Sequence, residues 1–114
     1  MATETYKTKG GKDVITEYID QLEGMEKARA KIILESLEKD GLEALEYMNT
    51  RQLSGKLYEI KFDNSRFMYV VIDCNLIHIL HACKKQKGKT SQSDLNTAKK
   101  RAVKLGKKLG KTFV

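Results

Sequence analysis

The stretch LIHILHACKKQKGKTSQSD, residues 76–94, decides how the rest of the chain is arranged. Its first eight residues are apolar apart from two histidines, which indicates a strand buried inside a sheet. Four lysines then follow within six positions, and a run of small polar residues comes after them. A buried strand that ends in positive charge presents that charge at a rigid sheet edge, where a ligand can reach it without disturbing the core.

Two more strand-like segments precede this one. In LYEIKF, residues 57–62, the apolar side chains of Tyr58, Ile60 and Phe62 face one way and alternate with the others. RFMYVVI, residues 66–72, is a second apolar segment, and the turn formers DNS and DCN separate the three. Three consecutive strands joined by tight turns predict an antiparallel meander.

The segments on either side of the meander show helical spacing. Apolar residues recur at that spacing after Asp13, a good N-cap, until Gly24 interrupts, and a second helix is predicted over residues 25–39. The short connection between these two helices predicts an antiparallel helical hairpin. Near the other end, a narrow apolar stripe predicts a helix over residues 93–109, and basic residues occupy most of its other positions.

The order of these elements predicts an α+β fold. We expect a single domain, residues 1–114, in which the N-terminal helical hairpin packs on a small antiparallel sheet and a basic helix follows the sheet. The sheet contains the three-strand meander and, as a candidate fourth strand, residues 4–8. No apolar run approaches the roughly 18 residues that span a bilayer, and the first residues lack the apolar core of a signal peptide. We therefore expect a cytoplasmic protein with no membrane partner.

Charge is distributed unevenly along the chain. Residues 84–111 hold eleven of the 22 Lys and Arg residues and one of the 15 acids, although the whole chain carries only +7. Residues 13–46, in contrast, hold ten acids and four bases. A solubilising surface does not require such segregation, so the pattern favours a face that binds a polyanion such as nucleic acid.

Several side chains in and after the strands have the types needed to cleave RNA. The 2′-hydroxyl of RNA is its own nucleophile, so cleavage needs a base for that hydroxyl, cations for the charged transition state and an acid for the leaving 5′-oxygen. Crowding could also lower a lysine pKa and make one lysine a base. The residues that offer these groups are Glu59, Lys61, Arg66, His81, Lys84, Lys85, Lys87 and Lys89.

The histidines and tyrosines of the strands are weaker candidates. His78 and His81 are three residues apart, so strict alternation places them on opposite faces, and His81 is nearer the basic end. A structural role is the alternative for a single histidine in a strand. Tyr69 could stack on the bases of a single strand that crosses the sheet, with a position in the core as the alternative.

Metal and cofactor chemistry has little support in the sequence. Cys74 and Cys83 are the only cysteines, their spacing matches no zinc motif and the two histidines do not complete one, so we expect reduced thiols. No carboxylate cluster of the kind that holds two catalytic metals accompanies the basic residues. We therefore expect no metal and no cofactor.

Several ordered motifs resemble those of the HigB-type, phage-derived branch of the RelE/ParE toxin superfamily. They are QLSGKLYEIKF (52–62), RFMYVVID (66–73) and LIHILHACKKQKGKTSQSDLNTAKKR (76–101), and a glycine-containing lead-in to the helices precedes them. The branch typically has Leu-x-Gly-x-Leu-Tyr-Glu-Leu-Arg, Arg-x-x-Tyr, a Leu-His strand end, a Lys-Lys-x-x-Lys-Thr loop and a helix with Ala-x-x-Arg. The resemblance covers about residues 8–105.

The resemblance implies the toxin of a type II toxin–antitoxin system. Such a toxin cleaves mRNA on the ribosome and is neutralised by a cognate helix-turn-helix antitoxin, with which it forms a hetero-oligomer. The matched positions are Glu59, Arg66, Tyr69, His81, Lys85 and Lys89. Together with the residues singled out above, they give a candidate catalytic set of Glu59, Arg66, His81 and Lys85, and a candidate RNA-binding set of Lys61, Tyr69, Lys84, Lys87 and Lys89.

Three positions depart from the pattern of the branch. Lys61 stands where the branch has an arginine and so loses its bidentate fork. Ser91 replaces a proline, so that a serine–aspartate cap formed with Asp94 begins the helix, and Cys83 stands at a position that is commonly aromatic. Two alternatives stay open: a gyrase-inhibiting toxin on the same scaffold, which does not need crowded lysines, and a non-catalytic nucleic-acid-binding phage protein.

Overall fold

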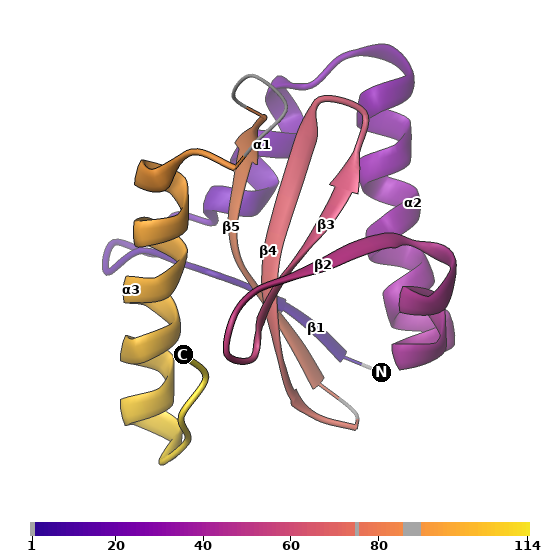
Figure 1. The fold of residues 1–114 in the computed structure, drawn as a ribbon. Helices are drawn as coiled ribbons and strands as arrows, with labels where there is room; N and C mark the ends of the chain where they lie inside the picture. The colour runs from indigo at the N-terminus through magenta and orange to yellow at the C-terminus, as the bar shows by residue number, and fades with distance from the viewer. Residues whose placement is uncertain (1, 75, 86–89) are drawn as a thin grey trace.

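The computed structural model describes residues 2–74, 76–85 and 90–114, and these form one mixed five-stranded sheet flanked by helices (Figure 1). The strands lie in the order β1-β5-β4-β3-β2. β1 runs parallel to β5, and the other neighbours are antiparallel. The strands are β1 (Ala2–Thr5), β2 (Asn49–Ser54), β3 (Leu57–Phe62), β4 (Ser65–Asp73) and β5 (Leu76–Lys84).

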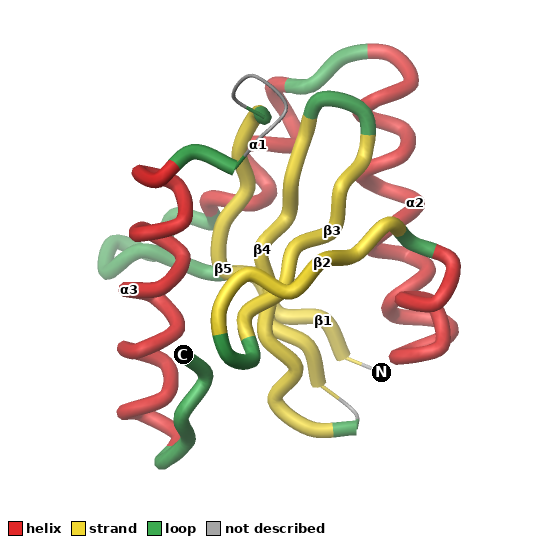
Figure 2. The backbone as a smooth tube through the Cα atoms, in the orientation of Figure 1, coloured by secondary structure: helices red, strands yellow, loops and turns green. Residues whose placement is uncertain are grey.

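Helices cover both faces of this sheet (Figure 2). α1 (Val14–Gln21), α2 (Gly24–Asp40) and the 3-10 helix η1 (Gly41–Tyr47) lie on one face. α3 (Gln92–Leu109) lies on the other face. Within the described residues, no helix is both long enough and apolar enough to cross a membrane.

The two faces have separate hydrophobic cores. The larger core lies under α1 and α2 and includes Ile15, Leu37 and Phe67. The smaller core, on the α3 side, joins sheet residues such as Met68 to Ala102 of α3. Because α3 offers mainly alanines to the sheet, it packs closely, and most of its lysines are exposed.

Local sequence determines where the helices begin and end. Asp13 caps α1, and its Oδ1 accepts hydrogen bonds from the backbone nitrogens of Ile15 and Thr16 at 3.1 and 3.0 Å. Ser91 caps α3 and accepts a hydrogen bond of 3.1 Å from the nitrogen of Asp94. Both predicted caps are therefore confirmed.

The predicted α+β class and the meander β3-β4-β5 are confirmed, but the sheet is larger than expected. β2 is an edge strand whose first four residues are exposed, so it has no apolar alternation from which it could be predicted. The N-terminal strand is Ala2–Thr5 rather than residues 4–8, and it pairs in parallel with β5. The antiparallel sheet of the prediction is therefore a mixed one.

The N-terminal helices also differ from the prediction in their packing. α1 lies mainly against β5 and makes fewer contacts with α2. The two helices therefore pack on the sheet as predicted, although their arrangement is not that of a simple antiparallel hairpin. Each helix covers its own part of the same sheet face because that face, with Phe62, Phe67 and Ile79, is apolar along its length.

A β-bulge changes the faces of β5. Leu80 is the extra residue between the two that pair with β4, Ile79 and His81, so the alternation slips by one position there. As a result both histidines face α3: His78 lines a pocket against that helix, and His81 contacts Asp94. The prediction that they lie on opposite faces is wrong.

The last residues of the chain close the smaller core. Phe113 is 3% exposed, and its carbonyl oxygen accepts a hydrogen bond of 2.6 Å from the nitrogen of Lys56. A Cβ at Gly55 would lie 2.7 Å from that same oxygen, so only glycine fits in this turn between β2 and β3. The tail thus fastens β2 and β3 to the α3 layer.

Candidate functional site

The centre of the candidate site is a buried ion pair on the α3 side of the sheet. Glu59 of β3 and Arg66 of β4 face this side because each lies two residues from a member of the smaller core, Leu57 and Met68. Glu59 is fully buried and Arg66 is 6% exposed. Glu59 Oε1 lies 3.9 Å from Arg66 Nε, so each buried charge has a partner of opposite sign.

Two further residues hold Glu59 from other directions. Arg51 of β2 lies opposite Glu59 in the sheet, and its Nη2 is 3.3 Å from Glu59 Oε1. Thr90, which precedes α3, donates a hydrogen bond of 2.6 Å from Oγ1 to Glu59 Oε2. The carboxylate is therefore held by β2, β4 and the segment that leads into α3.

This ion pair retains hydrogen-bonding capacity that the described residues do not use. Arg66 donates from Nη1 to the carbonyl oxygen of Ser65 at 2.9 Å, whereas Arg66 Nε and Glu59 Oε1 are buried without a hydrogen-bond partner among the described residues. Leaving buried polar atoms unpaired costs free energy, so such atoms mark places that suit a ligand or an ordered water. A guanidinium with an unused donor suits an oxyanion such as phosphate.

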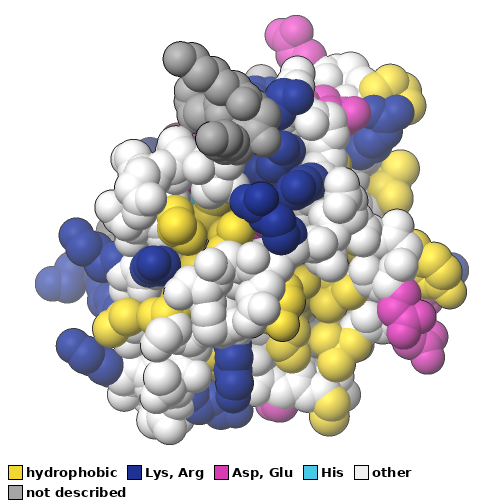
Figure 3. All heavy atoms as spheres, in the orientation of Figure 1, with side chains coloured by type: hydrophobic (Ala, Val, Ile, Leu, Met, Phe, Trp, Pro, Cys, Tyr) yellow, Lys and Arg dark blue, Asp and Glu magenta, His cyan; other side chains and the backbone are white. Residues whose placement is uncertain are grey.

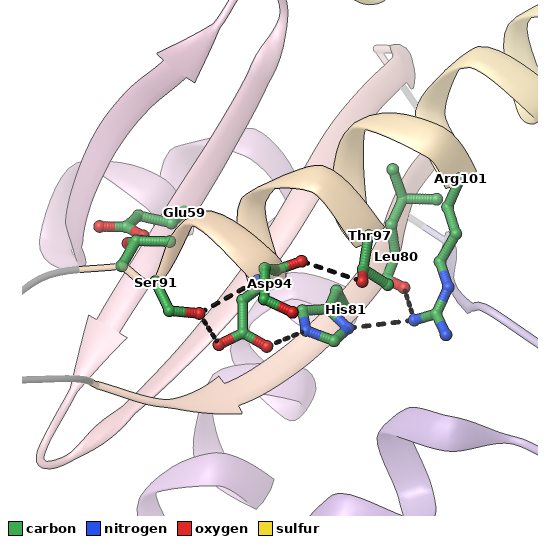
Figure 4. Close-up of polar contacts among 9 residues, drawn as sticks. Glu59, Leu80, His81, Ser91, Asp94, Thr97 and Arg101 are labelled. Atoms are coloured by element: carbon green, nitrogen blue, oxygen red, sulfur yellow. Dashed lines mark hydrogen bonds and ion pairs between the residues drawn. The ribbon is translucent and has the colours of Figure 1, made fainter.

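Beside this pair, His81 of β5 is held between two side chains of α3 (Figure 4). Its Nε2 lies 2.8 Å from Asp94 Oδ1, and its Nδ1 accepts a hydrogen bond of 3.1 Å from Arg101 Nη1. Because an arginine can only donate, Nδ1 carries no proton, and Nε2–H donates to Asp94. Both ring nitrogens are therefore occupied.

Asp94 and Cys83 have shifted pKa values in this cluster. Burial alone would raise the pKa of Asp94, but hydrogen bonds from Ser91 and His81 hold it below its ordinary value. Burial, reinforced by the charge of Asp94, raises the pKa of the Cys83 thiol to about 12. Cys83 therefore carries its proton at neutral pH and is not a nucleophile here.

The lysines of the basic block are not equivalent. Lys84 Nζ donates a hydrogen bond of 2.8 Å to Glu26 and lies 5.9 Å from the ring centroid of Tyr18, so Lys84 faces α1 and α2. The Glu26 carboxylate raises the pKa of Lys84, which contradicts the idea that crowding makes this lysine a base. Lys84 therefore does not lie on the α3 side with the other residues of the predicted RNA-binding surface.

The structure describes two of the other four lysines of the predicted site. Lys85 is exposed, and alternation from Cys83 places it on the α3 side. Lys61 is half-buried and pairs with Arg66 across the sheet. Lys87 and Lys89 lie outside the described residues, so their predicted contacts with RNA stay predictions.

Tyr69 does not lie where a base could stack on it. It is 3% exposed in the larger core, on the α1 and α2 face, where its ring centroid is 6.0 Å from that of Tyr58. Burial raises its pKa to about 12. The prediction that Tyr69 binds RNA is therefore wrong, and the alternative of a core position is confirmed.

The surface above the buried pair is positively charged. In the space-filling view, Lys and Arg side chains gather over the strands beside the grey residues, and others lie along the α3 side (Figure 3). The strand register places Arg51 and Lys61 in this region. Acidic side chains in this view lie mainly at its top and right-hand margins, where some basic side chains lie as well.

Sequence reasoning missed several residues of the site. From the sequence, Arg51, Thr90 and Arg101 receive no part in the chemistry, and Asp94 is assigned only to the helix cap. The contacts of these four cross between elements that are far apart in the chain, such as Arg101 with His81. Only the cap pattern of Ser91 and Asp94 gives a local signal, and it places the cap without indicating that Asp94 also binds the histidine.

The fold and this basic, arginine-lined surface define a small α+β protein suited to binding an anionic partner. Residues 17–103 match the family model described as Phage derived protein Gp49-like (DUF891), and the chain belongs to this family. The family is one of RelE/HigB-like toxins. No curated protein matches the chain.

Proposed function

We propose that this protein is the toxin of a type II toxin–antitoxin system and cleaves mRNA on the ribosome without a metal. The observation that carries the proposal is the buried pair of Glu59 and Arg66, in which the donor at Arg66 Nε is used by none of the residues that the structure describes. Arg51 beside it and the basic surface above it supply the further positive charge that a phosphodiester backbone requires. Membership of a toxin-like phage-derived family supports the same reading.

In the proposed reaction the 2′-oxygen of one nucleotide attacks the adjacent phosphorus. The bond from the 2′-oxygen to phosphorus forms, and the bond from phosphorus to the 5′-oxygen breaks, which leaves a 2′,3′-cyclic phosphate and a 5′-hydroxyl end. Arg66 and Arg51 neutralise the charge that builds up on the phosphoryl oxygens. The water-poor surroundings of Glu59 and Arg66 strengthen this electrostatic contribution.

Glu59 is the proposed acceptor of the 2′-hydroxyl proton. Arg51, whose side chain is 51% exposed, lies beside it in the present arrangement. A phosphate that binds Arg51 and Arg66 competes for the cations that now hold Glu59, and so frees Oε1 as a base.

The proton for the leaving 5′-oxygen is assigned to the ammonium group of Lys85. His81 is a candidate donor by residue type, but its Nδ1 accepts from Arg101, and a neutral ring that gave up its Nε2 proton would become an anion. His81 could act only after that contact is broken. In this proposal His81 instead holds the start of α3, and with it Thr90, against the site.

The test is cleavage of a defined mRNA in a reconstituted translation reaction. Primer extension would map cuts, and the upstream fragment would be tested for a 2′,3′-cyclic phosphate. We expect cleavage of mRNA on ribosomes and none of the same mRNA alone. Arg66→Gln and Glu59→Gln should lose cleavage about 100-fold or more, as expected when an electrostatic group of a site is removed.

Arg29→Gln is the matched control, because Arg29 is an arginine of α2 that pairs with Asp63 on the other side of the sheet. Circular dichroism would confirm that each variant is folded. Full activity in Arg66→Gln would contradict the site, and cleavage of free mRNA at the same rate would contradict dependence on the ribosome. Intact mRNA together with inhibited gyrase would favour the gyrase-inhibiting toxin. Intact mRNA together with RNA binding alone would favour the non-catalytic nucleic-acid-binding protein.

The proposed partner is a helix-turn-helix antitoxin encoded next to this gene. Co-expression of that neighbour should restore growth and yield a complex that copurifies with this chain. A neighbouring protein that neither binds the chain nor relieves growth arrest would contradict the proposal of a cognate antitoxin.

A further inference from the structure

Three metal-binding side chains meet beside the proposed cleavage site. They are His81 and Cys83 of β5 and Asp94 of α3, and their candidate ligand atoms all lie within 4.8 Å of one another. His81 and Cys83 are two residues apart on the strand, beyond the bulge at Leu80, so both point toward α3. Asp94 in the first turn of α3 then completes a three-sided group from two elements.

We propose that these three residues form a binding site for Zn²⁺, with a fourth position open to water or another ligand. Tetrahedral zinc with nitrogen, oxygen and sulfur ligands has ligand atoms roughly 3.3–3.8 Å apart. The observed ligand atoms all lie within 4.8 Å of one another, so the longest separation must shorten by at most about 1 Å. The pair of His81 Nε2 and Asp94 Oδ1, now 2.8 Å apart, must separate slightly to admit the ion.

The chemistry of the ligands selects the ion. A thiolate and an imidazole favour a borderline-soft cation such as Zn²⁺, whereas Mg²⁺ and Ca²⁺ prefer sites made of oxygen atoms. The thiol of Cys83 is not expected from the resemblance, which has an aromatic residue at this position. The site is therefore a feature of this chain rather than of the scaffold.

Zinc binding at this site requires two protons to move, one from Cys83 and one on the ring of His81. Zn²⁺ replaces the proton of the Cys83 thiol, which is released to solvent, and binds the Asp94 carboxylate directly. His81 must bind through Nε2, so its proton moves to Nδ1. Arg101 now donates to Nδ1 and opposes that tautomer, so metal binding must displace Arg101 from the ring.

The position of the site gives it a further consequence, which rests on the proposed function. Cys83 lies opposite Arg66 in the sheet, and Ser91, which donates to Asp94, is adjacent in sequence to Thr90, which donates to Glu59. A metal ion bound to Asp94 would shift Ser91 and the adjacent Thr90, and so weaken the hydrogen bond from Thr90 to Glu59. Zn²⁺ is therefore expected to lower mRNA cleavage by wild-type protein and to have a weaker effect on Cys83→Ser.

The site itself is tested by titrating the purified metal-free protein with Co²⁺, which replaces zinc and reports its ligands by absorption. We expect one equivalent to bind, with a thiolate-to-cobalt band and the strong visible bands of a tetrahedral ion, and Zn²⁺ to remove them. Cys83→Ser should lose the thiolate band. Cys74→Ser, which changes the other, exposed cysteine, should keep it.

Two more variants sharpen this test. Asp94→Asn should weaken binding, and circular dichroism would show whether α3 remains folded. Arg101→Gln should bind Zn²⁺ about tenfold more tightly, since an amide oxygen can accept from Nδ1–H in place of the opposing donor. Absence of a thiolate band in the folded protein, or a band lost in Cys74→Ser but kept in Cys83→Ser, would overturn the site whether or not mRNA is cleaved.

Discussion

Two neighbouring lysines at the end of β5 have opposite surroundings. Lys84 is bound by Glu26 on the α1 and α2 side of the sheet, and Lys85 is exposed, on the α3 side with Arg66. We expect Lys85→Ala to relieve growth arrest and to reduce mRNA cleavage by at least tenfold, as for loss of a general acid. Lys84→Ala should keep cleavage close to that of the wild type. Equal losses in the two variants would contradict this division between the faces.

Asp13 links a local cap to stability in acid. Burial alone would raise its pKa, but hydrogen bonds from Thr16, Thr5 and Ile15 lower it below the ordinary 3.8. A carboxyl whose pKa is lower in the folded state stabilises the fold above its unfolded pKa, and this contribution is lost as the pH falls through the folded pKa.

The free energy of unfolding should therefore drop in wild type below about pH 4 more steeply than in Asp13→Asn, which keeps a capping oxygen but cannot titrate. Urea unfolding at a series of pH values would measure the difference. Parallel curves for the two proteins would show that Asp13 does not contribute to the acid sensitivity.

For individual site residues, the sequence predicts which side chains take part better than it predicts what surrounds each of them. Glu59, Arg66 and His81 do come together on one side of the sheet. Tyr69 and Arg66 both lie in an apolar strand, and alternation separates their faces without indicating which face packs against α1 and α2 and which against α3. The roles proposed for Thr90 and Arg101 depend on contacts across the chain that no local pattern contains.

Among the elements, α3 depends on the cap that replaces a proline. Ser91 accepts from the nitrogen of Asp94, so Ser91→Ala should cost about 1 kcal/mol in the free energy of unfolding. Ser93→Ala, an exposed position in the same turn, is the control and should have little effect. Urea unfolding would compare the two, and a cost shared equally by both would argue against the cap.

Apolar periodicity in the sequence predicts some helices and strands of this fold and misses others. The boundaries of α3 and of the meander are close to prediction because their apolar patterns are strong. The bulge at Leu80 leaves no mark in a strand that is apolar on both faces, yet it turns His78 and His81 to the same side. β2 is recognisable only through its pairing with β3, because it lies at an edge and is mostly exposed.

For the whole molecule, the C-terminal tail completes the second core. Phe113 is buried against the α3 layer and anchors the turn at Gly55. Phe113→Ala should lower the free energy of unfolding by about 3 kcal/mol, as for other buried aromatic residues. Thr112→Ala, its exposed neighbour, should be nearly neutral. Chemical denaturation of both variants would check this, and a neutral Phe113→Ala would mean that the tail is dispensable.

In the folded chain, the acidic segment and the basic segment lie on opposite faces of the sheet. The acidic segment forms the α1 and α2 layer, and the basic segment forms the end of β5 and α3. This division leaves the α3 side of the sheet as the surface for a polyanion. Composition predicts that such a surface exists, whereas the strand register is needed to place Arg51, Lys61 and Arg66 on it.

The central claim, that this surface cleaves translated mRNA, is tested most directly in cells. The measurement is inducible expression in bacteria, with mapping of the 5′ ends of total RNA before and after induction. We expect new 5′ ends inside translated regions, in phase with codons, and none on induction of Arg66→Gln at equal protein level. Growth arrest with mRNA that stays intact would contradict it.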